Sequence, residues 1–301
     1  MSTVDPLTLW QNYSEKEQRI AEDILKKHGY RLAEKQPHII GERYVMQAVT
    51  TTSGKKLVLV GKDTKTDRMV IIKTAHDASG IQEIEHERAA KKTLKEIYFG
   101  YAVFETPEEL LYLKEGGRVF AVYEFIEQEK PFLTYTNEEQ FYWALSAFKA
   151  QENTHATTYT HLKHIRNTFK TFTAENYKKH LREFVKTIRE FSNGFEKLAE
   201  VEALFEKESA VVEQYCGFLT HVDFVPHNFR INHDTVYLLD FSSLRFGNKY
   251  EGWARFLNYM TLYNPTVTGW LVEYVEKNRP PEEALSLKLM RLYRLSELIS
   301  F

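Results

Sequence analysis

The sequence contains very little cysteine, and this limits the chemistry that it can support. Cys216 is the single cysteine among 301 residues. An intrachain disulfide is therefore impossible, and a cysteine-rich metal site is excluded. Cys216 lies in the segment QYCGFLTH, where we interpret it as a buried, inert thiol; a reactive thiol is the alternative.

Long apolar runs and an excess of one charge are also missing. The longest apolar stretch lies near VFAVYEFI, residues 119–126, and is far too short to span a bilayer. Residues 1–20 are polar and lack the apolar core of a signal peptide. The formal net charge is −2, so no overall field favours nucleic acid or an anionic membrane. We therefore expect a cytoplasmic protein that binds neither nucleic acid nor a membrane.

The composition is that of a soluble globular protein. Hydrophobic residues make up 43% of the chain and charged residues 27%. A chain of 301 residues is long enough for two lobes with a shared cleft. We find no internal repeat and no low-complexity tract.

The first residues predict a helix. Residues 14–28 carry apolar side chains at helical spacing. Ser14 followed by Glu17 fits a capping box at the start of this helix, and Gly29 is a suitable stop.

Short runs rich in β-branched and aliphatic residues follow. Three of them are separated by tight polar connections and predict an antiparallel meander: RYVMQAVT (43–50), KKLVLVGKD (55–63) and RMVIIKTA (68–75). Residues 76–97 then predict a helix. Two more strands, LLYLKEG and RVFAVYEFI, are joined by a turn at Gly116–Gly117.

The remainder of the chain is mainly helical in pattern. Residues 137–215 predict helices almost throughout, with one strong apolar stripe formed by Tyr177, Leu181, Phe184, Val185, Ile188 and Phe191. A mixed block with strand-like pieces spans residues 217–241. After it, the pattern is helical again up to Phe301.

The mixed block contains the strongest local motif. HVDFVPHNF begins at His221, and VYLLDF follows it; Asn228 lies five residues after Asp223, and Asp240 twelve after Asn228. Phosphoryl transfer from ATP needs one carboxylate to orient or deprotonate the attacking hydroxyl. It also needs an amide oxygen and a second carboxylate to hold magnesium. The alternative is a chance motif in a surface loop.

This segment resembles the catalytic segment of the aminoglycoside phosphotransferase and choline-kinase group, which are small-molecule kinases related to the protein kinases. The group has H-G-D-x-x-P-x-N, then an apolar strand ending in I-D-[FW]. The matching positions here are His221, Asp223, Pro226, Asn228, Asp240 and Phe241, and Val222 replaces the glycine. The resemblance implies that Asp223 is the catalytic base, that Asn228 and Asp240 are magnesium ligands and that His221 supports the loop. It implies ATP and Mg²⁺ as cofactors.

The resemblance and the order of elements together predict an α+β, two-lobe protein-kinase-like fold. We expect a small antiparallel five-stranded N-lobe with one helix and a larger, mainly helical C-lobe. The expected parts are an N-terminal helical extension (1–38), a nucleotide-binding N-lobe (39–126) and a C-lobe with the catalytic loop and substrate site (127–301).

Other positions fit a nucleotide site. VIIK places Lys73 after three aliphatic residues, where kinases have the lysine that contacts the ATP phosphates. Glu87 lies 14 residues later in the predicted helix and is our choice for its ion-pair partner; Glu85 is the competing choice. A surface lysine and a solvated glutamate are the plainer alternatives.

By the same resemblance, the segment after the fifth strand is the hinge between lobes. The Glu124 carbonyl and the Ile126 amide would face the adenine, with Tyr123 as gatekeeper. The phosphate-covering turn would be residues 50–54, with Ser53 and Gly54 donating backbone N–H groups; a plain polar hairpin is the alternative there.

The sequence also departs from the group. Gly252 stands where the group has a second acid that supports the loop, and Glu251 beside it is a possible substitute. The chain has no A-P-E element, and Asp240-Phe241-Ser242 is not D-F-G, so a small-molecule kinase is favoured over a protein kinase. A non-catalytic pseudokinase and a helical scaffold protein are the alternatives from other classes.

The acceptor is expected to be the hydroxyl of an aminoglycoside, an amino alcohol or a sugar-like compound. Residues 161–190 hold eight Lys and Arg against three Asp and Glu. This balance favours an anionic or neutral acceptor, or is simply that of a solvated helix face. The oligomeric state is not indicated.

Overall fold

The structure, a computed structural model, describes most of the chain. The described ranges are 6–36, 56–97, 103–154, 167–191 and 197–300. Two compact units are present: Met1–Arg88 with Pro107–Ile126, and Ala89–Thr106 with Glu127–Phe301. Each is described by itself. Among the described helices, none combines the length and hydropathy needed to cross a membrane.

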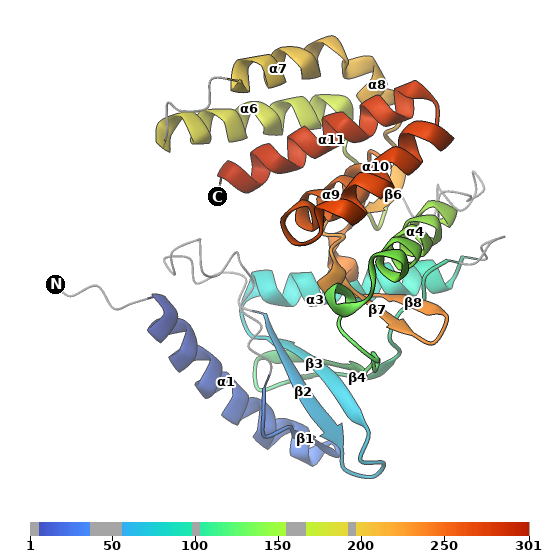
Figure 1. Ribbon diagram of the computed structural model, residues 1–301. Coiled ribbons are helices and arrows are strands. Elements are labelled where there is room, and N and C mark those ends of the chain that lie inside the picture. The colour runs from blue at the N-terminus through green and yellow to red at the C-terminus, as the bar shows by residue number, and fades with distance from the viewer. Residues whose placement is uncertain (1–5, 37–55, 98–102, 155–166, 192–196, 301) are drawn as a thin grey trace. The chain divides into compact units, whose positions relative to one another are not determined.

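The first unit is a β-sheet with helices on its two faces (Figure 1). Its elements are α1 (Pro6–Lys27), β1 (Tyr30–Leu32), β2 (Leu57–Asp63), β3 (Met69–Ala75), the first part of α3 (Ala78–Lys95), β4 (Glu109–Glu115) and β5 (Arg118–Glu124). The five strands form one antiparallel sheet in the order β1-β2-β3-β5-β4. A five-stranded antiparallel sheet with one inserted helix is as predicted, and β2 to β5 are the predicted strands, but β1 is not the strand that was predicted to come first.

Alternate side chains of the central strands face different helices. Ile72 of β3 and Phe120 of β5 pack with α1, whereas Ala121 packs with Ile84 of α3. Successive side chains of a strand point to opposite faces, and Lys73 pairs with Ala121 across the two strands. Lys73 therefore lies on the face of the sheet that α3 covers.

The edges of this unit differ from the prediction. α1 begins at Pro6, so Ser14 and Glu17 lie inside the helix and form no capping box; the Glu17 carboxylate instead pairs with Arg118 at 2.7 Å. The predicted strand 43–50 lies outside the described residues. The sheet includes Tyr30–Leu32, a strand too short for its periodicity to be detected.

The two-glycine connection between β4 and β5 is a tight hairpin turn. Gly116 has a φ of 59° and Gly117 a φ of 72°. Two successive positive φ values are typical of a type I′ turn, whose twist matches that of the flanking strands. The glycines were predicted as a turn, and this geometry is the reason they are needed.

The second unit is mainly helical. Its helices are α4 (Asn137–Asn153), α6 (Ala174–Phe191), α7 (Leu198–Lys207), α8 (Ser209–Gln214), α9 (Glu251–Tyr263), α10 (Pro265–Asn278) and α11 (Pro281–Ser300). Two small antiparallel sheets interrupt them: β6 (Phe218–His221) with β9 (Leu244–Gly247), and β7 (Phe229–Asn232) with β8 (Thr235–Leu238). The fold therefore brings four short strands around the His221–Asp240 segment.

Two expectations for this unit are wrong in detail. β9 lies where a return to helix was predicted, because its strand structure depends on pairing with β6, a distant segment. Phe191 does not join the apolar stripe of α6 and is 82% exposed, whereas Tyr177, Leu181 and Val185 are buried as expected. Phe191 lies at the last residue of the helix, beyond the packed part of that face.

Candidate active site

Asp223 and Asn228 are held together by a short loop after β6. Pro226–Asn228 forms one 3₁₀ turn, which brings the Asn228 side chain back toward Asp223. The Asn228 Nδ2 donates to the Asp223 backbone oxygen at 2.7 Å and to its Oδ2 at 2.9 Å. These bonds engage only the amide nitrogen, so the amide oxygen is the atom that suits a hard cation.

The loop is anchored in the aromatic core. Phe224, directly after Asp223, is 1% exposed. Its ring stacks on that of Phe229, with centroids 5.7 Å apart, and also contacts Phe148. The buried Phe224 ring therefore fixes the backbone from which Asp223 projects.

Asp240 follows β8 and lies beside this loop. The Leu239 N–H donates to the Asn228 carbonyl at 2.7 Å, so the two ligand candidates are joined through the backbone. Asp240 has a φ of 58° and a ψ of 58°, the left-handed region that side chains other than glycine rarely adopt. Such strained positions gather at functional sites, because the surrounding structure must hold them.

His221 holds the Asp240 backbone through hydrogen bonds. Its Nε2 lies 3.0 Å from both the Leu239 and the Asp240 carbonyl oxygens, to which it donates. The ring is buried, and desolvation lowers the pKa of His221 from its ordinary value. A neutral His221 with its proton on Nε2 satisfies these contacts, and this geometry suits the supporting role predicted for it.

In the first unit, Lys73 and Glu87 form a buried ion pair. The Lys73 Nζ lies 2.5 Å from the Glu87 Oε2, and Glu87 is 1% exposed. Glu85, the competing choice, instead contacts Lys114 and Tyr112. A lysine on the α3 face of the sheet meets Glu87 because that residue projects from the inner side of the helix.

The predicted hinge residues lie at the end of β5 and just beyond it. Glu124 ends the strand, and its N–H donates to the Glu108 carbonyl at 2.9 Å. Ile126 is buried, and so is Tyr123, whose ring centroid lies 5.9 Å from the Lys73 Nζ. Ser53 and Gly54 of the predicted phosphate turn lie outside the described residues. The adenine and phosphate roles remain predictions.

Comparison with known proteins identifies the fold. No protein-family model and no curated protein matches the sequence. A macrolide 2′-phosphotransferase of type I is 12% identical with a TM-score of 0.60, covering 94% of this chain and 90% of that one. The macrolide 2′-phosphotransferase MphH from Brachybacterium faecium is 13% identical with a TM-score of 0.59, covering 92% and 93%. The aminoglycoside phosphotransferase APH(4)-Ia is 12% identical with a TM-score of 0.54, covering 92% and 90%.

The chain has the fold of the aminoglycoside and macrolide phosphotransferases. This is the two-lobe, protein-kinase-like α+β fold that the sequence predicts, so the resemblance drawn from the His221–Phe241 segment is confirmed for the fold.

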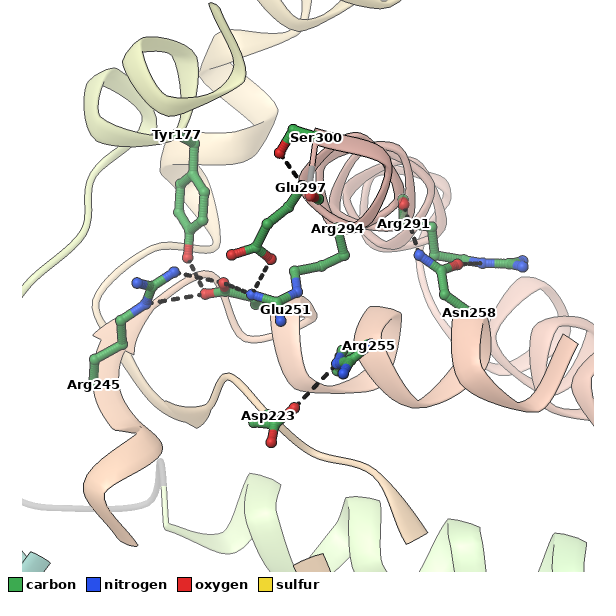
Figure 2. A network of polar contacts seen from close by, with 10 residues as sticks. All are labelled: Tyr177, Asp223, Arg245, Glu251, Arg255, Asn258, Arg291, Arg294, Glu297 and Ser300. Carbon is green, nitrogen blue, oxygen red and sulfur yellow. Dashed lines mark hydrogen bonds and ion pairs between the residues drawn. The ribbon is translucent and has the colours of Figure 1, made fainter. Parts of the chain in front are cut away.

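Within this fold, Arg255 contacts Asp223, which the sequence did not reveal. It lies on α9, and its Nε donates to the Asp223 Oδ1 at 3.1 Å (Figure 2). Asp223 thus has one oxygen turned to Arg255 and the other to Asn228, which fixes its orientation. No spacing rule links residues 223 and 255, because the contact depends on where α9 packs.

Glu251 does not take the place of the missing acid beside the loop. Its buried carboxylate accepts from Tyr177 at 2.6 Å and pairs with Arg245 at 2.5 Å and Arg294 at 3.5 Å (Figure 2). These partners come from α6, β9 and α11. Glu251 therefore joins elements around the start of α9, and the suggestion that it supports the loop is wrong.

Gln151 of α4 supports the loop instead. Its Oε1 accepts from the His221 N–H at 3.3 Å, and the side chain is 0% exposed. A Cβ on Gly252 would lie 2.7 Å from the His221 carbonyl oxygen and 3.0 Å from the Gln151 Oε1. The glycine is therefore the residue that lets α9, Gln151 and the loop approach one another. The signal in the sequence was the missing acid at position 252, but it did not indicate the replacement.

This close approach predicts opposite effects at two helical glycines. Gly252→Ala should lower the free energy of unfolding by about 1–3 kcal/mol, because a backbone oxygen must move. Gly269→Ala in α10 is the matched control, since no atom lies within 4 Å of the added Cβ; it should raise stability by about 0.5–1 kcal/mol. Urea unfolding of both variants tests this, and equal effects at the two positions would contradict the packing described.

Proposed function

We propose that this protein transfers the γ-phosphoryl group of ATP, with Mg²⁺, to a hydroxyl group of a small molecule. The observation that carries the proposal is the joined arrangement of Asp223, Asn228 and Asp240 in a phosphotransferase fold. Solved structures of that fold include complexes with ATP and streptomycin, with ADP and hygromycin B, and with GDP and kanamycin. They support a nucleotide as donor and a small hydroxylated molecule as acceptor.

Asn228 and Asp240 fit a magnesium ion. They offer an amide oxygen and a carboxylate, and the Leu239–Asn228 backbone bond keeps them adjacent. Among the described residues, no group of three or more His, Cys, Asp or Glu side chains could hold a metal ion. Two protein ligands are what Mg²⁺ commonly takes, because it keeps waters and phosphate oxygens as its other ligands. When bound, the ion would neutralise charge on the β- and γ-phosphates.

Asp223 is the proposed base. The acceptor oxygen forms a bond to the γ-phosphorus while the bond between that phosphorus and the bridging oxygen breaks, and the hydroxyl proton passes to the Asp223 carboxylate. Arg255 and Asn228 hold this carboxylate from two sides, so its direction is set before the acceptor arrives. Most of the rate gain would come from such positioning and from charge neutralisation.

Lys73 is the proposed ligand of the nucleotide phosphates. Its ion pair with Glu87 keeps the side chain extended on the α3 face of the sheet. The Glu124 carbonyl and Ile126 N–H are proposed for the adenine edge, and Ser53 and Gly54 for the phosphates. All these roles come from the resemblance and remain proposals.

Thermal unfolding with and without nucleotide tests the first half of the proposal. Mg·ATP should raise the unfolding temperature, since a ligand at 100 times its Kd adds about 2.7 kcal/mol; ATP with EDTA should have a smaller effect. GTP is run in parallel because GDP complexes occur in this fold.

Radiolabelled phosphate transfer to aminoglycosides, macrolides, choline and sugars tests the second half of the proposal, the acceptor. No thermal shift and no transfer would rule the proposal out, whereas a shift without transfer or hydrolysis would favour a pseudokinase.

A further inference from the structure

One face of α9 starts beside Asp223 and carries large side chains, the last of which are exposed to solvent. Arg255, Tyr259, Leu262 and Tyr263 follow one another at positions i, i+4, i+7 and i+8, which share one side of a helix. Arg255 contacts the proposed base. Leu262 is 73% exposed and Tyr263 58% exposed. The α9 face, as we call these four residues, therefore extends from the proposed base to Tyr263, the last residue of the helix.

Aromatic contacts link this face to the catalytic loop. The exposed His227 follows Pro226 in that loop, and its ring meets that of Tyr259 edge-on with centroids 5.5 Å apart. Tyr259 in turn stacks on Tyr263, with centroids 4.5 Å apart and planes inclined by 24°. The stacked Tyr259 and Tyr263 rings therefore present aromatic surface beside the catalytic loop. Exposed apolar surface of this kind commonly marks a binding site.

A cavity adjoins the same helix. It has a volume of about 530 Å³, and its walls are mostly aliphatic, from α10 and α11. Asn258, one turn beyond Arg255 and one turn before Leu262, forms part of its lining, and Arg291 holds Asn258 through a 3.1 Å bond (Figure 2). The volume is that of a small-molecule pocket. Through Asn258, which neighbours both Arg255 and Leu262 on the helix, the cavity adjoins one side of the α9 face.

The charges around this surface disfavour a polycation. At its inner end Arg255 is paired with the Asp223 carboxylate, and Lys288 and Arg291 line the cavity, with Glu276 as the acidic residue among the cavity-lining side chains. Several ammonium groups placed here would face like charges, and like-charge contacts lower affinity for the wrong ligand. Aromatic and aliphatic groups would instead cover an apolar ligand face.

We propose that the α9 face and this cavity bind the phosphoryl acceptor, and that the acceptor is a hydroxylated ring compound with an extended apolar face and at most one positive charge. The inference rests on the proposed function and deepens it. The apolar face would lie on Tyr259, Leu262 and Tyr263, which places a hydroxyl at the inner end of the row beside Asp223. Its proton would pass to that carboxylate as the new phosphate ester forms.

The test combines binding and transfer. Calorimetry of the full chain compares erythromycin, a largely apolar ring with a single amine, with the polycation kanamycin. The wild type should bind erythromycin more tightly. Tyr263→Ser and Leu262→Ser should each weaken that binding about 10-fold or more, because each removes a large apolar side chain that the bound ligand would cover. Phe191→Ser is the matched control, because Phe191 is an exposed apolar residue of α6, a helix that contributes no residue to the α9 face or to the cavity lining.

Transfer of phosphate to both compounds, at varied concentrations, separates the two levels of the proposal. A KM for erythromycin that rises in Tyr263→Ser and Leu262→Ser but not in Phe191→Ser supports the acceptor site. Transfer to kanamycin but not to erythromycin would overturn the acceptor class while leaving phosphotransfer intact. Transfer to erythromycin with unchanged KM in both variants would overturn the site. Tyr263-dependent binding of erythromycin with no transfer to any acceptor would instead overturn the proposed function.

Discussion

Replacing Asp223 with asparagine is expected to lower turnover by about 10²–10⁴-fold, the range that a positioned general base contributes. Asparagine keeps the size of the side chain but cannot take the acceptor proton. Affinity for Mg·ATP should stay nearly unchanged, because the proposed metal ligands are Asn228 and Asp240. Steady-state kinetics with an acceptor that the wild type phosphorylates measures turnover. Calorimetry with Mg·ATP measures the affinity for the nucleotide.

A nearby aspartate gives the control for this result. Asp234 is exposed in the turn between β7 and β8, so Asp234→Asn removes the same charge close to the loop and should leave turnover unchanged. The Asp223–Arg255 pair is partly exposed, with side-chain exposures of 41% and 19%. Its loss should therefore cost less than about 1 kcal/mol of stability. Activity retained within a few-fold in Asp223→Asn would refute the role of base.

Replacing Asp240 with asparagine should weaken binding of Mg·ATP while leaving metal-free ATP binding unaltered. Losing the charge of a metal ligand should cost at least as much as losing a charged hydrogen bond, about 1.5–3 kcal/mol, or about 10–100-fold in affinity. Asparagine also tolerates the left-handed conformation of this position. The variant therefore tests the charge without disturbing the backbone. Calorimetry in Mg²⁺ and in EDTA distinguishes the two forms of the nucleotide.

Ser242 supplies the comparison for Asp240. Its Oγ donates to the Asp240 Oδ1 at 3.1 Å, so Ser242→Ala removes a hydrogen bond and keeps the carboxylate. Its effect on Mg·ATP affinity should be much smaller than that of Asp240→Asn. An equal loss of ATP affinity with and without Mg²⁺ in Asp240→Asn would show that the residue does not act through the metal.

The two predictions concern carboxylates in different surroundings. Asp223 is turned to an arginine and an amide, which hold it in place for a passing hydroxyl. Asp240 has a left-handed backbone conformation, and His221 fixes that backbone by donating to the Leu239 and Asp240 carbonyl oxygens. One group is thus oriented through its side chain and the other through its backbone, which suits a base and a metal ligand respectively.

Local pattern was sufficient for four of the five strands, β2 to β5, and for the ion pair of the first unit. The strands around Lys73 and Gly116–Gly117 follow from β-branched runs and a two-glycine turn. Once Lys73 lay on the α3 face of the sheet, the contact with Glu87 followed from helix geometry. Tyr30–Leu32 was missed, since three residues hold too little pattern and their strand structure depends on pairing with β2.

The amino-acid sequence by itself determined most of the helices and strands, the motif of Asp223, Asn228 and Asp240, and the lysine suited to a nucleotide, because these depend on neighbouring residues and short spacings. Only the tertiary structure decided that Arg255 contacts Asp223 and that Gln151 supports the loop, beside Gly252. It also decided that Tyr259 contacts His227 of the loop and stacks on Tyr263. Those contacts join segments distant in the chain. They depend on how α4 and α9 pack against the loop, and no local sequence pattern encodes that packing.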